Sequence, residues 1–279
     1  MKPIVVGYDV SPDSELAVRW AAAHAQAADL PLRVAIARGD LHTLSSWADD
    51  WTQGLADEWA ERARKLLGEV GAADAEVVVL DGLPADALIR ESATAECLVV
   101  GGRGRSVPVG MLLGSVSQHV ARHAGSPVVA VRDQQDPDAR SVVVGIDGSP
   151  ESHEALEFAL HYAGLHALTV EAVSVPERLH LYSEGVSPLV VPQLAAELAA
   201  HEERVLREAA DLMSRHPGVQ AELRQAEPGS PGRELVEASH HAALVVVGSR
   251  GRGGFAGLLL GSVSAHVLHK AHCPVVVTR

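Results

Sequence analysis

The sequence predicts an α/β protein of two tandem, doubly wound domains, each with a five-stranded parallel sheet. Three observations predict this class. Much of the first half of the chain recurs in the second half, and short apolar runs alternate with longer segments of helical period. The apolar runs are solid blocks, such as LVVVG at 244–248, rather than alternating ones. Strands that alternate with helices indicate βαβ units and a parallel sheet, and solid apolar strands are typical of a sheet covered on both faces.

The repeat sets the domain organisation. Three pairs of segments carry it: IVVGYDVSPDSELAVRWA (4–21) with VVVGIDGSPESHEALEFA (142–159), DGLPADALIRE (81–91) with PGSPGRELVEA (228–238), and SPVVAVR (126–132) with CPVVVTR (273–279). The polar, proline-bearing DQQDPDAR lies between the two copies and has the composition of a linker. We therefore expect one domain over 1–136 and a second over 137–279.

Each half alternates strands and helices in the same order. In the first half the pattern predicts strands near 3–8, 32–37, 76–80, 97–101 and 127–132, and helices near 13–28, 52–70, 84–94 and 114–124. In the second half it predicts strands near 141–146, 168–174, 219–225, 243–248 and 274–278, with helices between them.

Composition limits the classes of partner. The net charge of −13 disfavours a protein that coats nucleic acid or an anionic membrane, because the overall field repels phosphate. The N-terminal MKPIVVGYDV does not have the pattern of a secretion signal, and no apolar run reaches membrane-spanning length, so we expect a cytoplasmic protein. Cys97 and Cys273 lie beside apolar runs at non-equivalent places in the repeat, which predicts buried packing residues rather than a metal or redox site.

In each half, two segments that follow the carboxyl end of a strand have an unusual composition. The first strands end at Asp9 and Asp147, and the fourth strands continue into GGRGRSVPVGMLLGSVS (101–117) and GSRGRGGFAGLLLGSVS (248–264). In open parallel sheets, ligands bind at this edge, where the strand order reverses. If the first and fourth strands are neighbours, each aspartate meets the loop of its own half.

The loop sequence predicts a phosphate-binding turn. Without a Cβ, Gly248 and Gly251 can adopt left-handed turns and approach a ligand closely. Ser262 follows Gly261 at a helix start, where free N–H groups attract an anion, and the hydroxyls of Ser262 and Ser264 add donors. Neither GxxxxGK[ST] nor a GxGxxG directly after the first strand occurs. The alternative is a loop that only joins strand to helix, with Ser262 as N-cap.

The strand-end aspartate and the pattern G-x2-G-x9-G-[ST] resemble the ATP-binding branch of the universal stress proteins, here as a tandem pair. The resemblance covers both halves almost end to end. It implies the strand order 3-2-1-4-5, pairing of domains through the last strand, a homodimer, and ATP as the ligand. Magnesium could accompany the triphosphate, but we expect Asp9 and Asp147 to lie too far from the phosphates to bind it, and no separate metal site is predicted.

The resemblance also assigns site residues, position by position. In the first half these are Gly7 and Ala37 at the adenine, Asp9 near the ribose, and Gly101, Gly102, Arg103, Gly104, Arg105, Ser106, Val107, Gly114, Ser115, Val116 and Ser117 at the phosphates. In the second half they are Gly145 and Val173, Asp147, and Gly248, Ser249, Arg250, Gly251, Arg252, Gly253, Gly254, Gly261, Ser262, Val263 and Ser264.

The two loops differ at their centres. Pro108 removes a backbone donor from the first loop and stiffens it, and Val107 stands where the second loop has a glycine. We expect both halves to bind ATP, and the second half is the stronger candidate. The loop arginines either contact phosphate or remain solvated charges, and both interpretations stay open.

Other clusters favour structural roles. His119 and His123 form an HxxxH pair without an evident third ligand, which favours a solvated helix face over zinc. The spacing of Trp47, Trp51 and Trp59 favours packing or an interface over base stacking.

The function that follows is regulatory: ATP binding changes shape or assembly, and an unidentified protein partner reads the state. Neither loop contains Asp, Glu, Gln or His, so it offers donors but no group to orient a nucleophile. We therefore expect no dedicated catalysis and no catalytic residues. The alternatives are a slow ATPase or phosphotransferase at the same sites, and a structural stress protein whose loops bind nothing.

Overall fold

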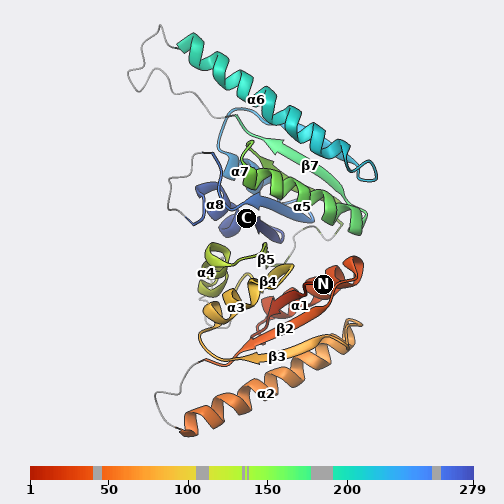
Figure 1. Cartoon of the computed structure of the whole chain (residues 1–279), viewed down its shortest axis with the longest axis vertical. Coiled ribbons are helices and arrows are strands. Elements are labelled where there is room, and N and C mark those ends of the chain that lie inside the picture. Colours follow the sequence, from red (N-terminus) through yellow and green to blue (C-terminus); the bar gives the residue numbers. More distant parts are fainter. Residues whose placement is uncertain (40–45, 105–112, 134–135, 137, 177–190, 253–258) are drawn as a thin grey trace. The chain divides into compact units, whose positions relative to one another are not determined.

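The computed structural model describes residues 1–39, 46–104, 113–133, 136, 138–176, 191–252 and 259–279, with the side chains of 46–52 and 191–192 left out. The chain packs as two compact units (Figure 1). The first comprises Met1–Gln135, Leu268–Val277 and Arg279, and the second comprises Asp136–Val267 and Thr278.

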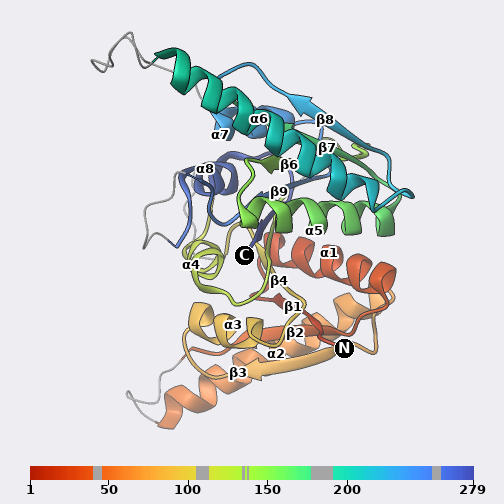
Figure 2. The same cartoon turned by 45° about the horizontal axis from the view of Figure 1, so that its top comes forward.

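The first unit is a doubly wound sheet with the order β3-β2-β1-β4-β5. Its elements are β1 (Ile4–Gly7), α1 (Pro12–Ala28), β2 (Leu32–Ala37), α2 (Ser46–Glu69), β3 (Glu76–Leu80), α3 (Pro84–Ser92), β4 (Cys97–Gly101), α4 (Ser115–His123) and β5 (Val128–Val131). These five strands are parallel to one another. Helix α1 packs beside α2 and helix α3 beside α4. Figure 2 shows α3 and α4 on one side of β1 and β4, and α1 on the other.

The second unit repeats this arrangement with the order β9-β6-β7-β8. Its elements are β6 (Ser141–Ile146), α5 (Pro150–His166), β7 (Thr169–Ser174), α6 (Val191–Ser214), β8 (Ala221–Gln225), α7 (Pro231–Ala238), β9 (Leu244–Gly248) and α8 (Ser262–Lys270). These strands are also parallel to one another. The predicted α/β class and strand order are confirmed.

The last strand, β10 (Val275–Thr278), belongs mostly to the first unit. It pairs antiparallel with β5, with Val276 opposite Val129. At the end of β5, the Arg132 guanidinium donates hydrogen bonds to the carbonyls of Leu268 and Ala271, the latter at 2.8 Å. The first unit therefore includes a strand that the sequence assigns to the second domain, and the domain limits 1–136 and 137–279 stay predictions.

The residues that enter α1 and α5 repeat the same chemistry. Ser11 caps α1 by accepting a hydrogen bond from the Ser14 amide, and Ser149 caps α5 from the Ser152 amide, each at 3.2 Å. A proline follows each cap, at the first helical turn, where its missing N–H costs no helical hydrogen bond. The strand-end aspartate thus lies directly before a firmly capped helix in both units.

Burial explains why the strands were predicted well. The blocks VVAV of β5 and LVVVG of β9 are buried throughout, as expected for a sheet covered on both faces. Helix α2 begins at residue 46, earlier than the predicted 52. Within the described residues, no helix is both long and apolar enough to cross a membrane.

Candidate functional site

The strand-end aspartate and the glycine loop meet in both units. Strands β1 and β4 are neighbours, with Val6 opposite Val99. The Ser11 hydroxyl lies 3.4 Å from the Arg103 carbonyl, so the turn after Asp9 touches the first loop. In the second unit the Arg252 amide donates to Asp147 Oδ2 at 3.0 Å. The strand order reverses here, between β1 and β4, which is where doubly wound sheets bind ligands.

A cavity of about 590 Å³ opens at this edge of the first unit. The predicted residues that line it are Gly7, Asp9, Ala37, Gly101, Arg103, Gly104, Gly114, Ser115, Val116 and Ser117. Residues that were not predicted also line it: Tyr8, Ser11, Ser14, Ala35, Trp59, Pro84, Leu88 and Val100. Gly102 does not line it, because it lies buried with its amide 2.6 Å from the Val131 carbonyl. Arg105, Ser106, Val107, Pro108, Gly253 and Gly254 lie outside the described residues.

Strand order divides the cavity into two sides. Since β2 and β4 flank β1, residues of β2 and its covering helices lie on one side and the β4 loop lies on the other. The first side is apolar and includes Ala35, Ala37 and Trp59. The second side presents the start of α4, where the first backbone N–H groups have no acceptor within the helix. The cavity therefore combines an apolar wall with a donor-rich wall, with Asp9 between them.

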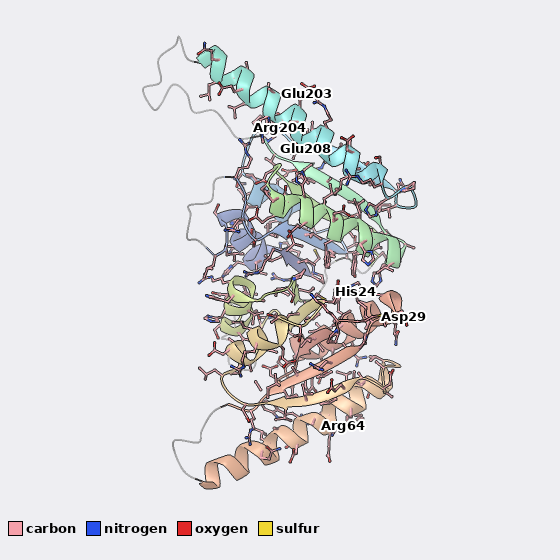
Figure 3. The ribbon with its side chains drawn as sticks, viewed as in Figure 1. His24, Asp29, Arg64, Glu203, Arg204 and Glu208 are labelled. Atoms are coloured by element: carbon pink, nitrogen blue, oxygen red, sulfur yellow. The ribbon has the colours of Figure 1, made fainter. Side chains whose placement is uncertain are left out.

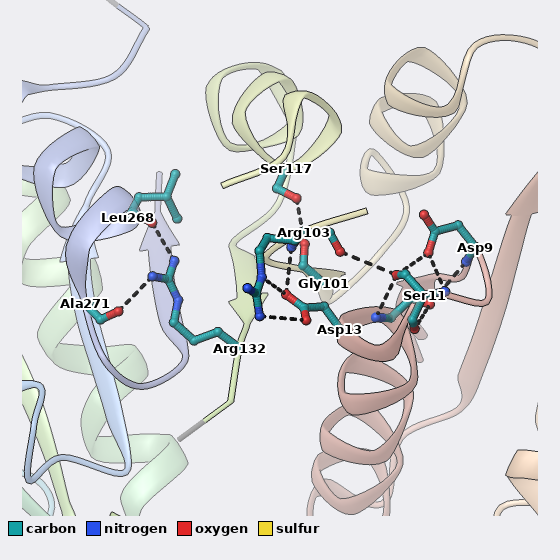
Figure 4. Close-up of polar contacts among 10 residues, drawn as sticks. Asp9, Ser11, Asp13, Gly101, Arg103, Ser117, Arg132, Leu268 and Ala271 are labelled. Carbon is teal, nitrogen blue, oxygen red and sulfur yellow. Dashed lines mark hydrogen bonds and ion pairs between the residues drawn. The ribbon is translucent and has the colours of Figure 1, made fainter. Parts of the chain in front are cut away.

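The two aspartates are held by equivalent hydrogen bonds. Asp9 Oδ1 accepts from the Ser11 amide at 3.1 Å and from the Ser11 hydroxyl (Figure 4). Asp147 Oδ1 accepts from the Ser149 amide at 3.0 Å and from its hydroxyl at 2.6 Å. Burial raises the pKa of the Asp147 carboxyl, but the hydrogen bonds outweigh it, so its pKa lies below the ordinary value. Asp147 is therefore fixed as a carboxylate.

The glycines of the loops have a packing role, which corrects the prediction of left-handed turns. Neither Gly248 nor Gly251 has a positive φ. A Cβ on Gly248 would lie 2.8 Å from the backbone carbon of Glu151, and a Cβ on Gly101 would lie 2.7 Å from that of Asp13. A Cβ on Gly251 would overlap the Asp147 carboxylate. These positions take glycine because the loop packs directly on the start of the first helix of its unit, α1 or α5, and on the aspartate.

The hydroxyls of Ser117 and Ser264 point back into the protein rather than outward. Ser117 Oγ donates to the Gly101 carbonyl at 2.6 Å, and Ser264 Oγ donates to the Gly248 carbonyl at 2.5 Å. Because each hydroxyl has one proton, Ser264 and Ser117 donate to backbone carbonyls in this arrangement, and their role as phosphate donors stays a prediction. Ser115 lines the cavity and is exposed, so its hydroxyl can donate a hydrogen bond to a phosphate.

Ser115 is also not the helix cap. Gly114 holds the N-cap position of α4, and no side chain caps this helix end. The Gly114 amide donates to the Gly102 carbonyl at 2.7 Å, and the Gly261 amide donates to the Ser249 carbonyl at 2.7 Å. Both loops are thus closed at their base by the same hydrogen bond, and the interpretation of Ser262 as a simple cap finds no support in its counterpart.

Two of the loop arginines brace the loops. The Arg103 guanidinium binds Asp13 through Nε at 3.1 Å and Nη2 at 3.3 Å, and the Arg103 amide donates to the same carboxylate at 2.9 Å (Figure 4). The hydrogen bonds and charge of Asp13 raise the pKa of Arg103. Arg250 pairs with Glu151 at 2.8 Å. Asp13 and Glu151 occupy equivalent places in the repeat, so the pair is duplicated.

Strand register corrects one predicted equivalence. Gly7 lies opposite Ala35, and Gly145 lies opposite Val173. Val173 is therefore the counterpart of Ala35 and not of Ala37. Both Ala35 and Ala37 line the cavity, so the prediction of Ala37 stands as a lining residue.

Trp59, Pro84 and Leu88 were not predicted as site residues. Pro84 and Leu88 belong to the repeated segment 81–91, and this repetition was the signal that could have found them. A Cβ on Gly7 would lie 2.9 Å from Leu88, as one on Gly145 would from Leu235. Trp59 was predicted as a packing residue, and it lies on the apolar wall.

The remaining candidates have no place in the site. His119 and His123 are exposed and stacked, with ring centroids 4.3 Å apart. Among the described residues, no group of three or more His, Cys, Asp or Glu side chains is arranged to hold a metal ion. Cys97 and Cys273 are free thiols and buried, and burial raises the pKa of Cys97 to about 12.

The fold and the site together define a class of protein: tandem, doubly wound α/β proteins. Each unit of this class has an aspartate and a glycine loop at the point where the strand order reverses. The chain belongs to the universal stress protein family, which matches it over residues 1–132 and 139–279. It is 36% identical over 293 residues to the universal stress protein Rv2005c of Mycobacterium tuberculosis, covering 99% of this chain and 96% of that one.

Two further similarities agree with this family. A universal stress protein of Mycolicibacterium smegmatis is 34% identical over 296 residues, covering 99% of this chain and 96% of its own. The crystal structure of a universal stress protein from Archaeoglobus fulgidus DSM 4304 covers 100% of this chain and 96% of its own, with a TM-score of 0.70 and 22% identity. The latter is a likeness of fold.

Proposed function

We propose that this universal stress protein binds ATP and acts as a nucleotide-dependent regulator in the stress response, without dedicated catalysis. The observation that carries the proposal is the cavity of about 590 Å³ between β2, β1 and β4. Its volume lies in the range of small-molecule sites, roughly 300–1,000 Å³. Its apolar wall suits a heterocyclic base, and its donor-rich wall suits phosphate.

The local positive charge at the start of α4 favours phosphate binding on the β4 side of the cavity. The helix dipole of α4 and its unpaired N–H groups provide a local positive field at Ser115–Ser117, although the whole chain is acidic. Asp9 lies between the two walls, at the position that suits a sugar hydroxyl. Its Oδ1 atom accepts hydrogen bonds from Ser11, which holds the carboxylate in place.

We further propose a cytoplasmic homodimer whose nucleotide state is read by a protein partner. The acidic net charge supports an aqueous setting away from anionic membranes. The chemistry of the partner stays open.

Titration tests the proposal. Purified protein is denatured and any released nucleotide is identified, and then stripped, refolded protein is titrated with ATP by calorimetry. The proposal predicts saturable binding of ATP. A stripped and folded preparation that binds no ATP would contradict it and would favour a structural protein.

Negligible turnover is a separate prediction. Phosphoryl transfer needs a residue that positions the attacking water or hydroxyl, and Asp9, the carboxylate of the cavity lining, is already bound to Ser11. Incubation with labelled ATP and magnesium should therefore yield little phosphate. Sustained turnover of about 1 per second, low in the usual enzyme range, that disappears in Gly114→Val would show a slow ATPase instead.

A further inference from the structure

Two strands end the strand order of their units, β3 in the first unit and β8 in the second, and their sequences differ in kind. Strand β3 reads EVVVL and β8 reads AELRQ. The strand register makes Arg224 the counterpart of Val78, and Gln225 the counterpart of Val79. Charged and polar side chains commonly protect an edge strand from pairing with another chain. Strand β8 therefore has this protection at its centre, whereas β3 has valines there.

The backbone of β3 also directs hydrogen-bonding groups outward. The Arg38 amide donates to the Leu80 carbonyl at 3.0 Å, so the backbone groups of Leu80 face β2. Because successive residues of a strand direct these groups to alternate sides, the N–H and C=O groups of Val77 and Val79 point away from β2. Both residues are half-buried. Helix α2 packs against both β2 and β3, so it covers a face of the sheet and leaves the outer edge of β3 accessible.

Other surfaces of the first unit suit a second copy of the chain less well. Strand β5 lies between β4 and β10, so the strand that the family resemblance assigns to pairing is already paired on both sides. The outer face of α2 carries exposed charges of both signs, among them Arg64 (Figure 3), as is typical of a solvated helix. Strand β3 combines apolar side chains with outward backbone groups, and such an edge accepts another strand.

A second copy of β3 fits this edge in the antiparallel direction, about a two-fold axis through Val78. In that register Val78 lies opposite Val78 of the second copy, and Val77 of each copy lies opposite Val79 of the other. Since Val77 and Val79 both have outward groups, each of these pairs exchanges two N–H···O=C hydrogen bonds. The two Val78 residues form a non-hydrogen-bonded pair, in which the side chains are closer, and β-branched pairs of this kind stabilise a sheet.

Charges beyond the ends of β3 are complementary in the same register, which places residue 74 of one copy opposite residue 82 of the other. Asp74 is exposed. Arg90 lies beside Gly82, because its Nη2 donates to the Asp81 carbonyl at 2.8 Å and lies 3.4 Å from a Cβ built on Gly82. The two-fold axis therefore brings Asp74 of each copy toward Arg90 of the other, so opposite charges meet at both ends.

We propose that the protein dimerises by antiparallel pairing of β3 with β3 of a second copy. This inference rests on the homodimer proposed above and adds its interface. The pairing is isologous, because the same strand serves on both copies. Since the charged residues of β8 protect the other edge, each chain offers one strand for pairing, and the assembly closes at two copies.

Oxidative cross-linking tests the register. Val78→Cys should form a disulfide between two chains, because the Cβ atoms of a directly opposed antiparallel pair lie about 4.5–5.5 Å apart, near the span of a disulfide. Cys97 and Cys273 are buried and should not cross-link. Leu223→Cys, at a half-buried position of β8, is the matched control and should remain a single chain on a non-reducing gel.

A second pair of variants removes one outward donor. Val79→Pro deletes an amide that points away from β2, so the ladder within the unit keeps its hydrogen bonds. The two-fold axis doubles the loss, and the dissociation constant of the dimer should rise at least about tenfold. Sedimentation measures it, on protein whose circular dichroism matches the wild type. Gln225→Pro makes the equivalent change on β8 and should leave the dimer intact.

A dimer that Val79→Pro leaves unchanged, or one in which Val78→Cys forms no disulfide, would overturn the inference and leave the proposed homodimer intact. A monomeric wild type would overturn both the inference and the homodimer. Neither result bears on ATP binding, which the calorimetric titration decides separately.

Discussion

At the scale of single residues, the aspartate that ends the first strand organises each site. Asp147 accepts hydrogen bonds from Ser149 and from the Arg252 amide, so it joins the helix cap to the glycine loop. These bonds favour the charged form, and together they hold the pKa of Asp147 below its ordinary value although burial acts in the opposite direction. The carboxylate thus stabilises the folded loop as well as facing the site.

This pKa predicts a pH dependence. A carboxyl whose pKa is lower in the folded state contributes stability above its unfolded pKa, near 3.8, and that contribution is lost as pH falls through the folded value. Urea unfolding between pH 6 and about pH 2.5 should therefore show a steeper loss of stability for wild type than for Asp147→Asn below pH 3.8. Parallel curves for the two proteins would contradict this role of Asp147.

At the scale of elements, the glycine at the end of the fourth strand sets how closely the loop packs on the first helix. Gly101 faces backbone atoms of α1 and Gly248 faces those of α5, at distances that a Cβ cannot occupy. The acidic residues there, Asp13 and Glu151, bind Arg103 and Arg250. The end of the strand, the loop and the helix start therefore form one packed group.

Gly101→Ala tests this packing. Its Cβ would lie 2.7 Å from the backbone of Asp13, and backbone cannot move aside cheaply. We expect a loss of about 1–3 kcal/mol in the free energy of unfolding, the range for overpacking, measured by urea denaturation. Gly68→Ala, in α2 with nothing within 4 Å, is the matched control and should be neutral or stabilising by up to about 1 kcal/mol. Equal effects of the two substitutions would show that the space at Gly101 is not restrictive.

The elements show what a sequence can and cannot predict. Strands such as VVAV of β5 were predicted within a residue or two, because their β-branched, fully buried composition is a local property. The antiparallel partnership of β5 with β10 was only implied by family resemblance, because no local pattern encodes it. The pairing of Ala37 with Val173 was wrong by two residues, because register depends on neighbouring strands.

The loop side of the site was predictable, whereas the apolar side was predictable only in part, at Gly7 and Ala37. Each aspartate and each glycine loop belongs to a short continuous motif. Strand order alone therefore predicted that the aspartate and the loop of each unit lie close together. Trp59 reaches the cavity from α2, and Ser117 bonds to a carbonyl that is distant in sequence; both depend on tertiary packing.

At the scale of the whole molecule, the tandem repeat has preserved the loops and varied the walls. Both loops close through the same amide-to-carbonyl bond and both are braced by an arginine–carboxylate pair. The second strands differ where Ala35 lines the cavity of the first unit, because Val173 holds the equivalent place in the second.

The measurement that tests the central claim most directly is the ATP affinity of Gly114→Val combined with Ser115→Ala. These changes crowd the start of α4 and remove an exposed hydroxyl that lines the cavity. Loss of one hydrogen bond to a charged group costs about 1.5–3 kcal/mol, which is roughly tenfold to a hundredfold in affinity. With Gly68→Ala as control, calorimetric titration should show that loss at the site of the first unit. An unchanged ATP affinity in a folded double variant would contradict the assignment of this cavity as the nucleotide site.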